Sequence, residues 1–562
     1  MSINNHFGWS DITRDDVLKA IDNFYRYEVD CPKARSTFLI YNGKKLPAKH
    51  IRGMAHKVHF GKEISKQDYS GGIETKLFFE RLGFEVRYTG NTKQHNKETT
   101  TEIQNYKSET KNDKDLKLVI SQKSTTESEK GIKIGLYLQT SNLHRQSSLF
   151  YKAMDKVRNS DIDILVFPEF SYVPFVNEFI GSDWADIDDA DFLCKKAIEL
   201  SQNIECAVIV CNQDSFGTII SIYANAFASE EETKTKYYIK HTQTAYSAFD
   251  FKDYKELSKY LFEPIIYKGK RIGTTICYDC NHALFSRMYG INGVDIIINS
   301  TGGNVVYDKW YKYNETRAIE NNCFTFVTMG GDDLGEKSNS FVYGFAPSGK
   351  KLIPTLLNGQ KAEKLNDPGT IYIYDTSSYD GTSEEDRSIN QAESVNKNID
   401  ILISENDIDG FVKSGYAISD NIRIVKNKGN NIVLCLINEE EIMKPEKVLK
   451  LLYSEELKEI ENKRYIIINH WDNLDYEFYK TKLSVVLKVR AMENYCAVIL
   501  DSDKYIKCFQ CGQNRTAQVI QPKNGKFGID LKRTGGPETI WRNKQGMRKE
   551  WRTNFERLID SI

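Results

Sequence analysis

The chain has 562 residues, more than one hydrophobic core usually supports, so several domains are expected. Its 77 Lys and Arg residues balance 78 Asp and Glu residues, which argues against nucleic-acid or membrane-surface binding along the whole chain. Neither a long apolar run nor a leader-like N-terminus is found, so we expect a cytoplasmic protein with reduced cysteines and no membrane contact.

Two polar segments divide the chain. Residues 90–130 and 376–398 are rich in Lys, Glu, Ser, Thr and Asn and hold few apolar side chains. Such segments cannot bury enough surface to offset their conformational entropy, so we interpret both as disordered linkers. The sequence therefore predicts three folded parts, at 8–89, 131–375 and 399–562.

The first part is predicted to be a small α+β head domain. Residues 37–87 predict a strand, a glycine turn, a helix bearing His50 and His56, and a second helix that ends at Gly83. The segments YNGK, LPAKHI, YSGG and LGFEV resemble the head domain in front of modification-dependent HNH restriction endonucleases. The resemblance implies contact with DNA or a protein, in a bacterial antiviral defence or DNA-linked system.

Basic residues are concentrated in the same segment. They are Lys44, Lys45, Lys49, Arg52, Lys57, Lys62 and Lys66. These side chains suit contact with phosphate groups, and a solvent-exposed helix face explains them equally well.

The middle part alternates apolar runs of strand length with helical patterns. Strands are expected at 133–139, 163–169, 205–212, 219–227, 235–239, 271–277, 294–299, 323–328 and 340–345, and helices at 147–157 and 193–203. This alternation predicts a layered α/β domain whose strands are buried on both faces.

Three segments of this domain place a reactive side chain at a strand end. Glu169 follows a strand in LVFPEF, Lys240 ends a strand in YYIKH, and Cys277 ends a strand in GTTICYDC. Taken singly, each fits an ordinary role as a turn residue, a solvated lysine or a core cysteine.

Together, the three segments resemble the nitrilase and amidase superfamily of carbon–nitrogen hydrolases over about residues 131–375. Their order matches that of the family, and so do the separations of 71 residues from Glu169 to Lys240 and of 37 residues from Lys240 to Cys277. The later segments RAIENN and PSG match as well. The resemblance implies a four-layer α-β-β-α sandwich with Cys277 as nucleophile and Glu169 as base. It further implies that Lys240 and the backbone N–H of Tyr278 stabilise the oxyanion.

The implied activity is hydrolysis of a non-peptide carbon–nitrogen bond, an amide rather than a nitrile, through a thioester and without metal or cofactor. Family members also self-associate and carry a second carboxylate, for which Asp250 is our first candidate and Asp253 and Glu256 are alternatives. Because the family favours glutamate there, the alternative of a catalytically inactive ligand-binding sensor or scaffold stays open. A third interpretation is acyl transfer from the thioester to an amine, which the sequence does not distinguish from hydrolysis.

The third part contains a repeat of the middle part. The segment RAIENNC at 317–323 recurs as RAMENYC at 490–496, and three further blocks keep the same order. We therefore predict a degenerate nitrilase-like half-domain after about residue 420, catalytically silent, that covers the active-site mouth or imitates a subunit contact. The alignment places Cys435 opposite Cys277. Cys508 and Cys511 have the spacing of zinc ligands but lack a second pair, so no metal site is predicted.

Overall fold

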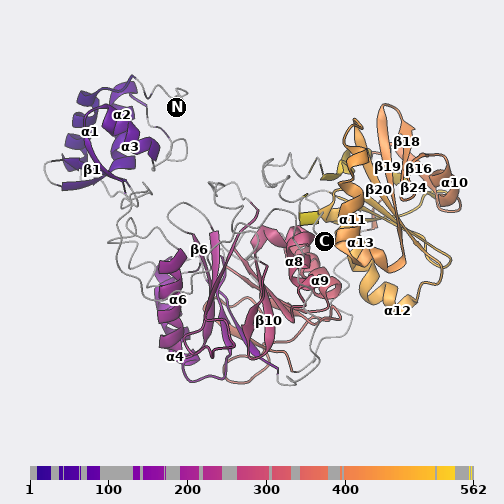
Figure 1. Ribbon diagram of the computed structural model, residues 1–562, viewed down its shortest axis with the longest axis horizontal. Coiled ribbons are helices and arrows are strands. Elements are labelled where there is room, and N and C mark those ends of the chain that lie inside the picture. The colour runs from indigo at the N-terminus through magenta and orange to yellow at the C-terminus, as the bar shows by residue number, and fades with distance from the viewer. Residues whose placement is uncertain are drawn as a thin grey trace. The chain divides into compact units, whose positions relative to one another are not determined.

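The computed structural model covers the head domain, the middle part and the repeat, and Figure 1 shows their elements. The described residues are 9, 11–26, 37–41, 44–62, 64, 73–88, 131–139, 143–169, 171, 190–213, 219–242, 262–302, 307–330, 342–377, 393–394, 398–512, 516–537, 539, 556 and 558–559. The predicted linker at 90–130 lies outside them, as does most of the one at 376–398. Within these ranges, every helix is too short or too polar to cross a lipid bilayer.

The head domain has the predicted α+β fold. Its elements are α1 (Arg14–Arg26), β1 (Thr37–Tyr41), β2 (Lys44–Pro47), α2 (Ala48–Phe60), α3 (Ile73–Arg81) and β3 (Glu85–Tyr88). Strand β1 pairs antiparallel with β2 and with β3, and the three helices and the sheet enclose a core of their own. Gly83 follows α3 at φ 73°, a left-handed conformation that glycine adopts without a Cβ clash.

Arg52 does not belong to a solvent-facing basic surface. Its guanidinium lies 4.0 Å from the ring centroid of Trp9, and Nη1 donates a hydrogen bond to Thr75 Oγ1 at 3.0 Å. Both Arg52 and Trp9 are buried, so this arginine holds the domain together. Lys57 and Lys62, by contrast, are exposed to solvent.

The central domain consists of two sheets with helices outside them. The first sheet, in the order β14-β4-β5-β6-β7-β8, contains β4 (Lys133–Tyr137), β5 (Ile164–Val166), β6 (Ala207–Gln213), β7 (Ile219–Ala224), β8 (Thr235–Ile239) and β14 (Ile371–Asp375). The second, in the order β13-β12-β11-β10-β9, contains β9 (Ile265–Tyr267), β10 (Lys270–Ile276), β11 (Ile296–Thr301), β12 (Phe324–Met329) and β13 (Tyr343–Phe345). The helices are α4 (Leu143–Val157), α6 (Ala190–Ile204), α8 (Ala283–Ile291) and α9 (Tyr307–Asn321).

The two sheets face each other across one apolar core. Ile134, Val166 and Ile209 of the first sheet and Ile272 and Ile298 of the second contribute to it. Figure 1 shows α4 and α6 outside the first sheet and α8 and α9 outside the second, the predicted α-β-β-α arrangement. Strands β4, β5 and β6 run parallel, as do β10, β11 and β12, so the carboxyl ends within each set meet at one rim.

The repeat folds as a half-domain in the same compact part of the chain as the central domain. Its large sheet, in the order β15-β23-β22-β21-β20-β19-β18-β17, contains β15 (Glu393–Ser394), β17 (Tyr416–Ser419), β18 (Ile422–Asn427), β19 (Asn430–Asn438), β20 (Lys463–Trp471), β21 (Ala497–Ser502), β22 (Lys507–Cys511) and β23 (Ala517–Ile520). The other elements are β16 (Ile401–Ser404), β24 (Lys526–Ile529), α10 (Ile408–Lys413), α11 (Pro445–Leu452), α12 (Tyr476–Phe478) and α13 (Ser484–Glu493).

Strands β18 to β22 repeat the second sheet of the central domain. β19, β20 and β21 are parallel, with antiparallel β18 and β22 at their sides, as β9 and β13 flank β10 to β12. Within the described part of this half-domain, no second large sheet accompanies them. The prediction that the repeat copies the later half of the central domain is therefore confirmed.

The predicted match of Cys435 to Cys277 is wrong. Strand β19 spans nine residues and β10 spans seven, so a comparison of the two segments without gaps pairs residues that are not equivalent in the structure. Cys435 lies in the middle of β19 and is fully buried. The residue at the end of β19 is Glu439, which has φ 39° where Cys277 has φ 47°, and each opens a 3-10 turn. Glu439 therefore stands at the position of Cys277.

Cys508 and Cys511 do not form a metal-binding pair. They lie three positions apart in strand β22, so their side chains point to opposite faces of the sheet. Both are buried, and Cys508 belongs to an apolar cluster.

Candidate active site

Glu169 and Lys240 form a buried ion pair. Glu169 follows β5 and Lys240 follows β8, and Lys240 Nζ donates to Glu169 Oε1 at 2.6 Å. Lys240 is 0% exposed and Glu169 is 3% exposed, so the pair has little contact with solvent. Burial by itself would lower the pKa of Lys240, but the Glu169 carboxylate raises it, which keeps the ammonium charged.

The second oxygen of Glu169 is held by the other sheet. Glu169 Oε2 accepts a hydrogen bond from the backbone N–H of Gly302, directly after β11, at 2.9 Å. Two residues before Gly302, still within β11, Ser300 Oγ donates a hydrogen bond to the Phe167 carbonyl at 2.9 Å. Glu169 is therefore fixed between the carboxyl ends of strands from both sheets.

Cys277 lies at the end of β10 in a left-handed conformation, φ 47°. Such a conformation is unfavourable for a residue with a Cβ, and strain of this kind is commonly found at functional sites. Burial raises the pKa of the Cys277 thiol well above its usual range, the Glu169 carboxylate raises it further, and the Lys240 ammonium opposes them. The thiol is therefore protonated at rest, close to the charges of both residues.

Asn299 in β11 anchors the backbone of the cysteine turn. Its Nδ2 donates to the Cys277 carbonyl at 3.4 Å and to Thr275 Oγ1 at 3.0 Å, and its Oδ1 accepts from Thr301 Oγ1 at 2.5 Å. In the half-domain, Asn469 Nδ2 donates to the Glu439 carbonyl at 3.1 Å. The same turn support thus persists where the cysteine has been replaced.

Asp279 is a site residue that the sequence analysis missed. Its carboxylate accepts from Tyr238 Oη at 2.9 Å and from the backbone N–H groups of His241 at 3.1 Å and Thr242 at 2.9 Å. These bonds tie the end of the lysine strand to the cysteine turn. The only signal in the sequence was an aspartate two residues after Cys277, directly beyond an apolar strand.

The buried position of Asp279 predicts a pH-dependent stability. Burial raises the pKa of Asp279 from 3.8 to about 6 in spite of its hydrogen bonds. Between these values the folded chain keeps a proton that the unfolded chain has released, so the stability contributed by Asp279 falls as pH rises, by about 3 kcal/mol in total. Urea denaturation of wild type and Asp279→Asn should show wild type gaining relative to the variant from pH 7 to pH 4.5. An equal difference at both pH values would contradict this assignment.

The other predicted site residues divide into described and undescribed ones. Tyr278 is buried in the turn that Cys277 opens, which continues through Cys280 and Asn281. Asp250, the predicted second carboxylate, lies outside the described residues, as do the alternatives Asp253 and Glu256. The structure thus brings Glu169, Lys240 and Cys277 together and leaves the fourth position a prediction.

Several solved structures are similar to part of the chain at low sequence identity. An amidase from Nesterenkonia sp. has 13% identity and a TM-score of 0.33, with 45% of this chain and 93% of that chain covered. A carbon–nitrogen hydrolase from Helicobacter pylori G27 has 16% identity and a TM-score of 0.30, covering 43% and 88%. Nit3 of Saccharomyces cerevisiae, described as a member of branch 10 of the nitrilase superfamily, has 16% identity and a TM-score of 0.30, covering 45% and 92%.

Family models match two segments of the chain, whereas no curated protein matches it. The carbon–nitrogen hydrolase model matches residues 131–345, which include Glu169, Lys240 and Cys277. The model of the ScoMcrA-like N-terminal head domain matches residues 10–88. The chain therefore carries a carbon–nitrogen hydrolase domain at residues 131–345, preceded by a ScoMcrA-like head domain.

Proposed function

We propose that the chain is a thiol-dependent hydrolase of a non-peptide carbon–nitrogen bond, an amide rather than a nitrile. The observation that supports this most is the buried Glu169–Lys240 pair, whose two charges act on the Cys277 thiol at a strained strand end. A protonated thiol needs a base as it attacks, and Glu169 is the carboxylate beside it.

Acylation begins when Cys277 Sγ bonds to the carbonyl carbon while its proton passes to Glu169. The electron pair of the carbonyl double bond moves to oxygen, where the Lys240 ammonium and the Tyr278 N–H stabilise it. The intermediate then collapses: the carbon–nitrogen bond breaks, Glu169 gives its proton to the departing nitrogen, and a Cys277 thioester remains. The preference for an amide over a nitrile rests on the family resemblance, because the Lys240 ammonium would stabilise the charge that develops in either reaction.

In deacylation, Glu169 again first accepts a proton and then gives it up. Water attacks the thioester carbon and loses a proton to Glu169, and the carbon–sulfur bond then breaks. The Cys277 sulfur takes the proton back, and the carboxylic acid leaves. Each cycle consumes one amide and one water and releases one amine or ammonia and one acid.

Product stoichiometry tests this proposal. The full chain is incubated with a panel of simple amides and nitriles, and released ammonia and carboxylic acid are both quantified. Equal amounts of the two are expected, whereas ammonia in excess of acid, released only when an added primary amine is present and matched by the amide of that amine, would indicate acyl transfer. Compounds that raise the melting temperature without any turnover would favour the ligand-binding sensor and overturn the proposal.

We further propose that the head domain contacts DNA phosphates, which places the enzyme in a cytoplasmic, DNA-linked defence system. The ten described cysteines are free thiols, which suits a reducing compartment. In fluorescence anisotropy with a labelled duplex, Lys57→Gln/Lys62→Gln in the full chain should weaken binding. The slope of log K against log salt concentration should also become less negative by about 2, since each phosphate contact contributes about 0.9 to that slope. Lys426→Gln/Lys504→Gln in the half-domain is the matched control, and equal behaviour of both variants would contradict a DNA role.

A further inference from the structure

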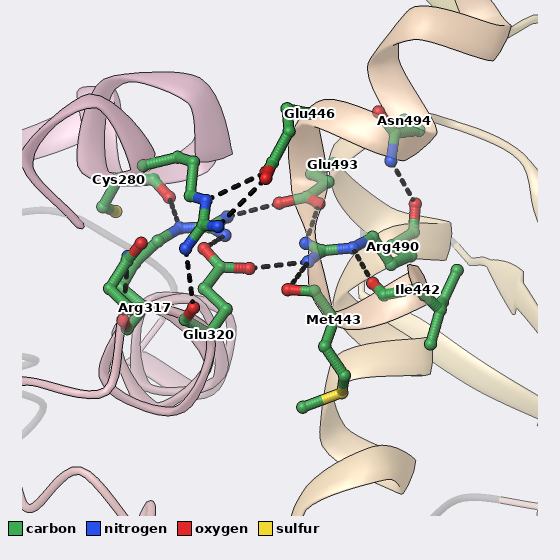
Figure 2. Close-up of polar contacts among 11 residues, drawn as sticks. Cys280, Arg317, Glu320, Ile442, Met443, Glu446, Arg490, Glu493 and Asn494 are labelled. Atoms are coloured by element: carbon green, nitrogen blue, oxygen red, sulfur yellow. Dashed lines mark hydrogen bonds and ion pairs between the residues drawn. The ribbon is translucent and has the colours of Figure 1, made fainter. Parts of the chain in front are cut away.

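Helices α9 and α13 bring the two copies of the repeated segment into contact. Figure 2 shows Arg317 and Glu320 of α9 facing Arg490 and Glu493 of α13. Arg317 pairs with Glu320 in its own helix and with Glu493 across the contact. Arg490 pairs with Glu493 in its own helix at 2.5 Å and with Glu320 across the contact at 2.7 Å. The four side chains form a closed ring in which each arginine bonds both carboxylates.

The ring is buried and remains charged. Both arginines are 0% exposed, Glu493 is 5% and Glu320 is 8% exposed. Burial by itself would lower the pKa of Arg490, but Glu493 and Glu320 raise it, and the two arginines hold the pKa of Glu320 below its usual range against the effect of burial. Removing one member would leave a buried charge without its partner, which is strongly unfavourable.

A second contact pairs the preceding helices of the two copies. Helix α8 follows the 3-10 turn that Cys277 opens, and α11 follows the one that Glu439 opens. Arg287 of α8 donates from Nε and Nη2 to the two carboxylate oxygens of Glu446 in α11, each at 2.9 Å. Equivalent helices thus meet equivalent helices, the pattern of a two-fold contact between identical subunits, here within one chain.

Each arginine of the ring also holds the turn of its own domain. Arg317 Nε donates to the Cys280 carbonyl at 3.1 Å, and Arg490 Nε donates to the Ile442 carbonyl at 3.0 Å. The two turns start at Cys277 and at Glu439, and each of these carbonyls belongs to the residue three positions after that start. A continuous path therefore runs from Glu493 of the half-domain through Arg317 to the turn that bears Cys277 (Figure 2).

We infer that the half-domain is a built-in partner subunit, and that Glu493 is a positioning residue that holds the Cys277 turn through Arg317. The half-domain contributes the contact and no nucleophile, because Glu439 stands where the cysteine would be. It fills the α8–α9 face of the central domain, so a second copy of the chain would have to bind elsewhere. The catalytic part of this inference rests on the proposed role of Cys277.

The test compares Glu493→Gln with Glu446→Gln in the full chain. Both remove a carboxylate charge from the same contact, but only Glu493 connects to the cysteine turn. Glu493→Gln should lower kcat for ammonia release about 10- to 100-fold with KM within about twofold, since small misplacements of reacting groups cost this much. Glu493→Asp should recover part of the loss, and Glu446→Gln should keep the wild-type kcat.

Hydrogen–deuterium exchange of residues 277–282 gives a readout that does not depend on turnover. Faster exchange is expected in Glu493→Gln and not in Glu446→Gln. Unchanged exchange and kcat in Glu493→Gln, or equal changes in both variants, would overturn the inference. If wild type releases no ammonia, the proposed function fails while the exchange result still decides whether the half-domain holds the turn.

Sedimentation velocity tests the built-in contact itself. Because the ring closes within one chain, Glu493→Gln should leave the molar mass in solution unchanged. A fall to half the wild-type mass would show that the contact joins two copies, and would overturn the inference.

Discussion

Cys277→Ala should lower ammonia release by about 10³-fold or more while leaving the chain folded. The nucleophile forms the covalent intermediate, so no other group can replace it, and what remains comes from binding and oxyanion stabilisation alone. Alanine keeps the Cβ and therefore the strained backbone, so the expected loss of stability is only that of one buried sulfur atom and the small cavity it leaves. Initial rates and the melting temperature measure the two effects.

Cys211→Ala is the matched control for this variant. Cys211 is a fully buried thiol in β6 whose pKa is raised by burial and by the charge of the same Glu169. It lies within a regular strand, without the strained backbone of Cys277. We expect Cys211→Ala to keep activity within about tenfold of wild type, a range that packing changes produce. Similar losses of activity in Cys211→Ala and Cys277→Ala would show that removing a buried thiol near Glu169 impairs the protein, whichever of the two cysteines is replaced.

Glu169→Gln should both slow turnover strongly and destabilise the chain. The amide cannot take the Cys277 proton, and loss of a general base typically costs about 10²- to 10⁴-fold in rate. The substitution also leaves the fully buried Lys240 ammonium without its charge partner, which costs about 3–5 kcal/mol. Ammonia release and urea denaturation at pH 7 measure these losses.

A double variant separates the two effects of that substitution. Glu169→Gln with Lys240→Met replaces the ion pair by neutral side chains of similar length, which removes the unpaired charge. We expect it to regain most of the lost stability and none of the activity. A double variant less stable than Glu169→Gln would mean that Lys240 is not held by the charge of Glu169.

Glu169, Lys240 and Cys277 could be singled out from the sequence because they lie at strand ends in three segments that together resemble a known family. Apolar runs of strand length located β5, β8 and β10. Lys240 and Cys277 come directly after their strands, and Glu169 comes three residues after β5. The rule that carboxyl ends of parallel strands meet at one rim applies to β5 and β10, whereas β8 pairs antiparallel with β7. The layered α/β class followed from the alternation of strand-length and helical runs, the four-layer sandwich from the family resemblance, and the half-domain from the repeated RAxEN segment and its neighbours.

The remaining features depend on register and on contacts distant in the sequence. A longer strand β19 moved the turn from Cys435 to Glu439, which a gapless comparison of residues cannot detect. Arg52 is basic like its neighbours, and only the position of Trp9 against it shows that it is buried. The ring across α9 and α13 was visible in the sequence only as a repeated RAxEN segment, because its partners are more than 150 residues apart.

Mass spectrometry of the intact chain after brief exposure to an amide substrate tests the central claim most directly. We expect an added mass equal to the acyl group, mapped to Cys277 by peptide analysis and removed by hydroxylamine. Ammonia release without such an adduct in wild type, or with the same adduct in Cys277→Ala, would contradict the assignment of Cys277 as the nucleophile.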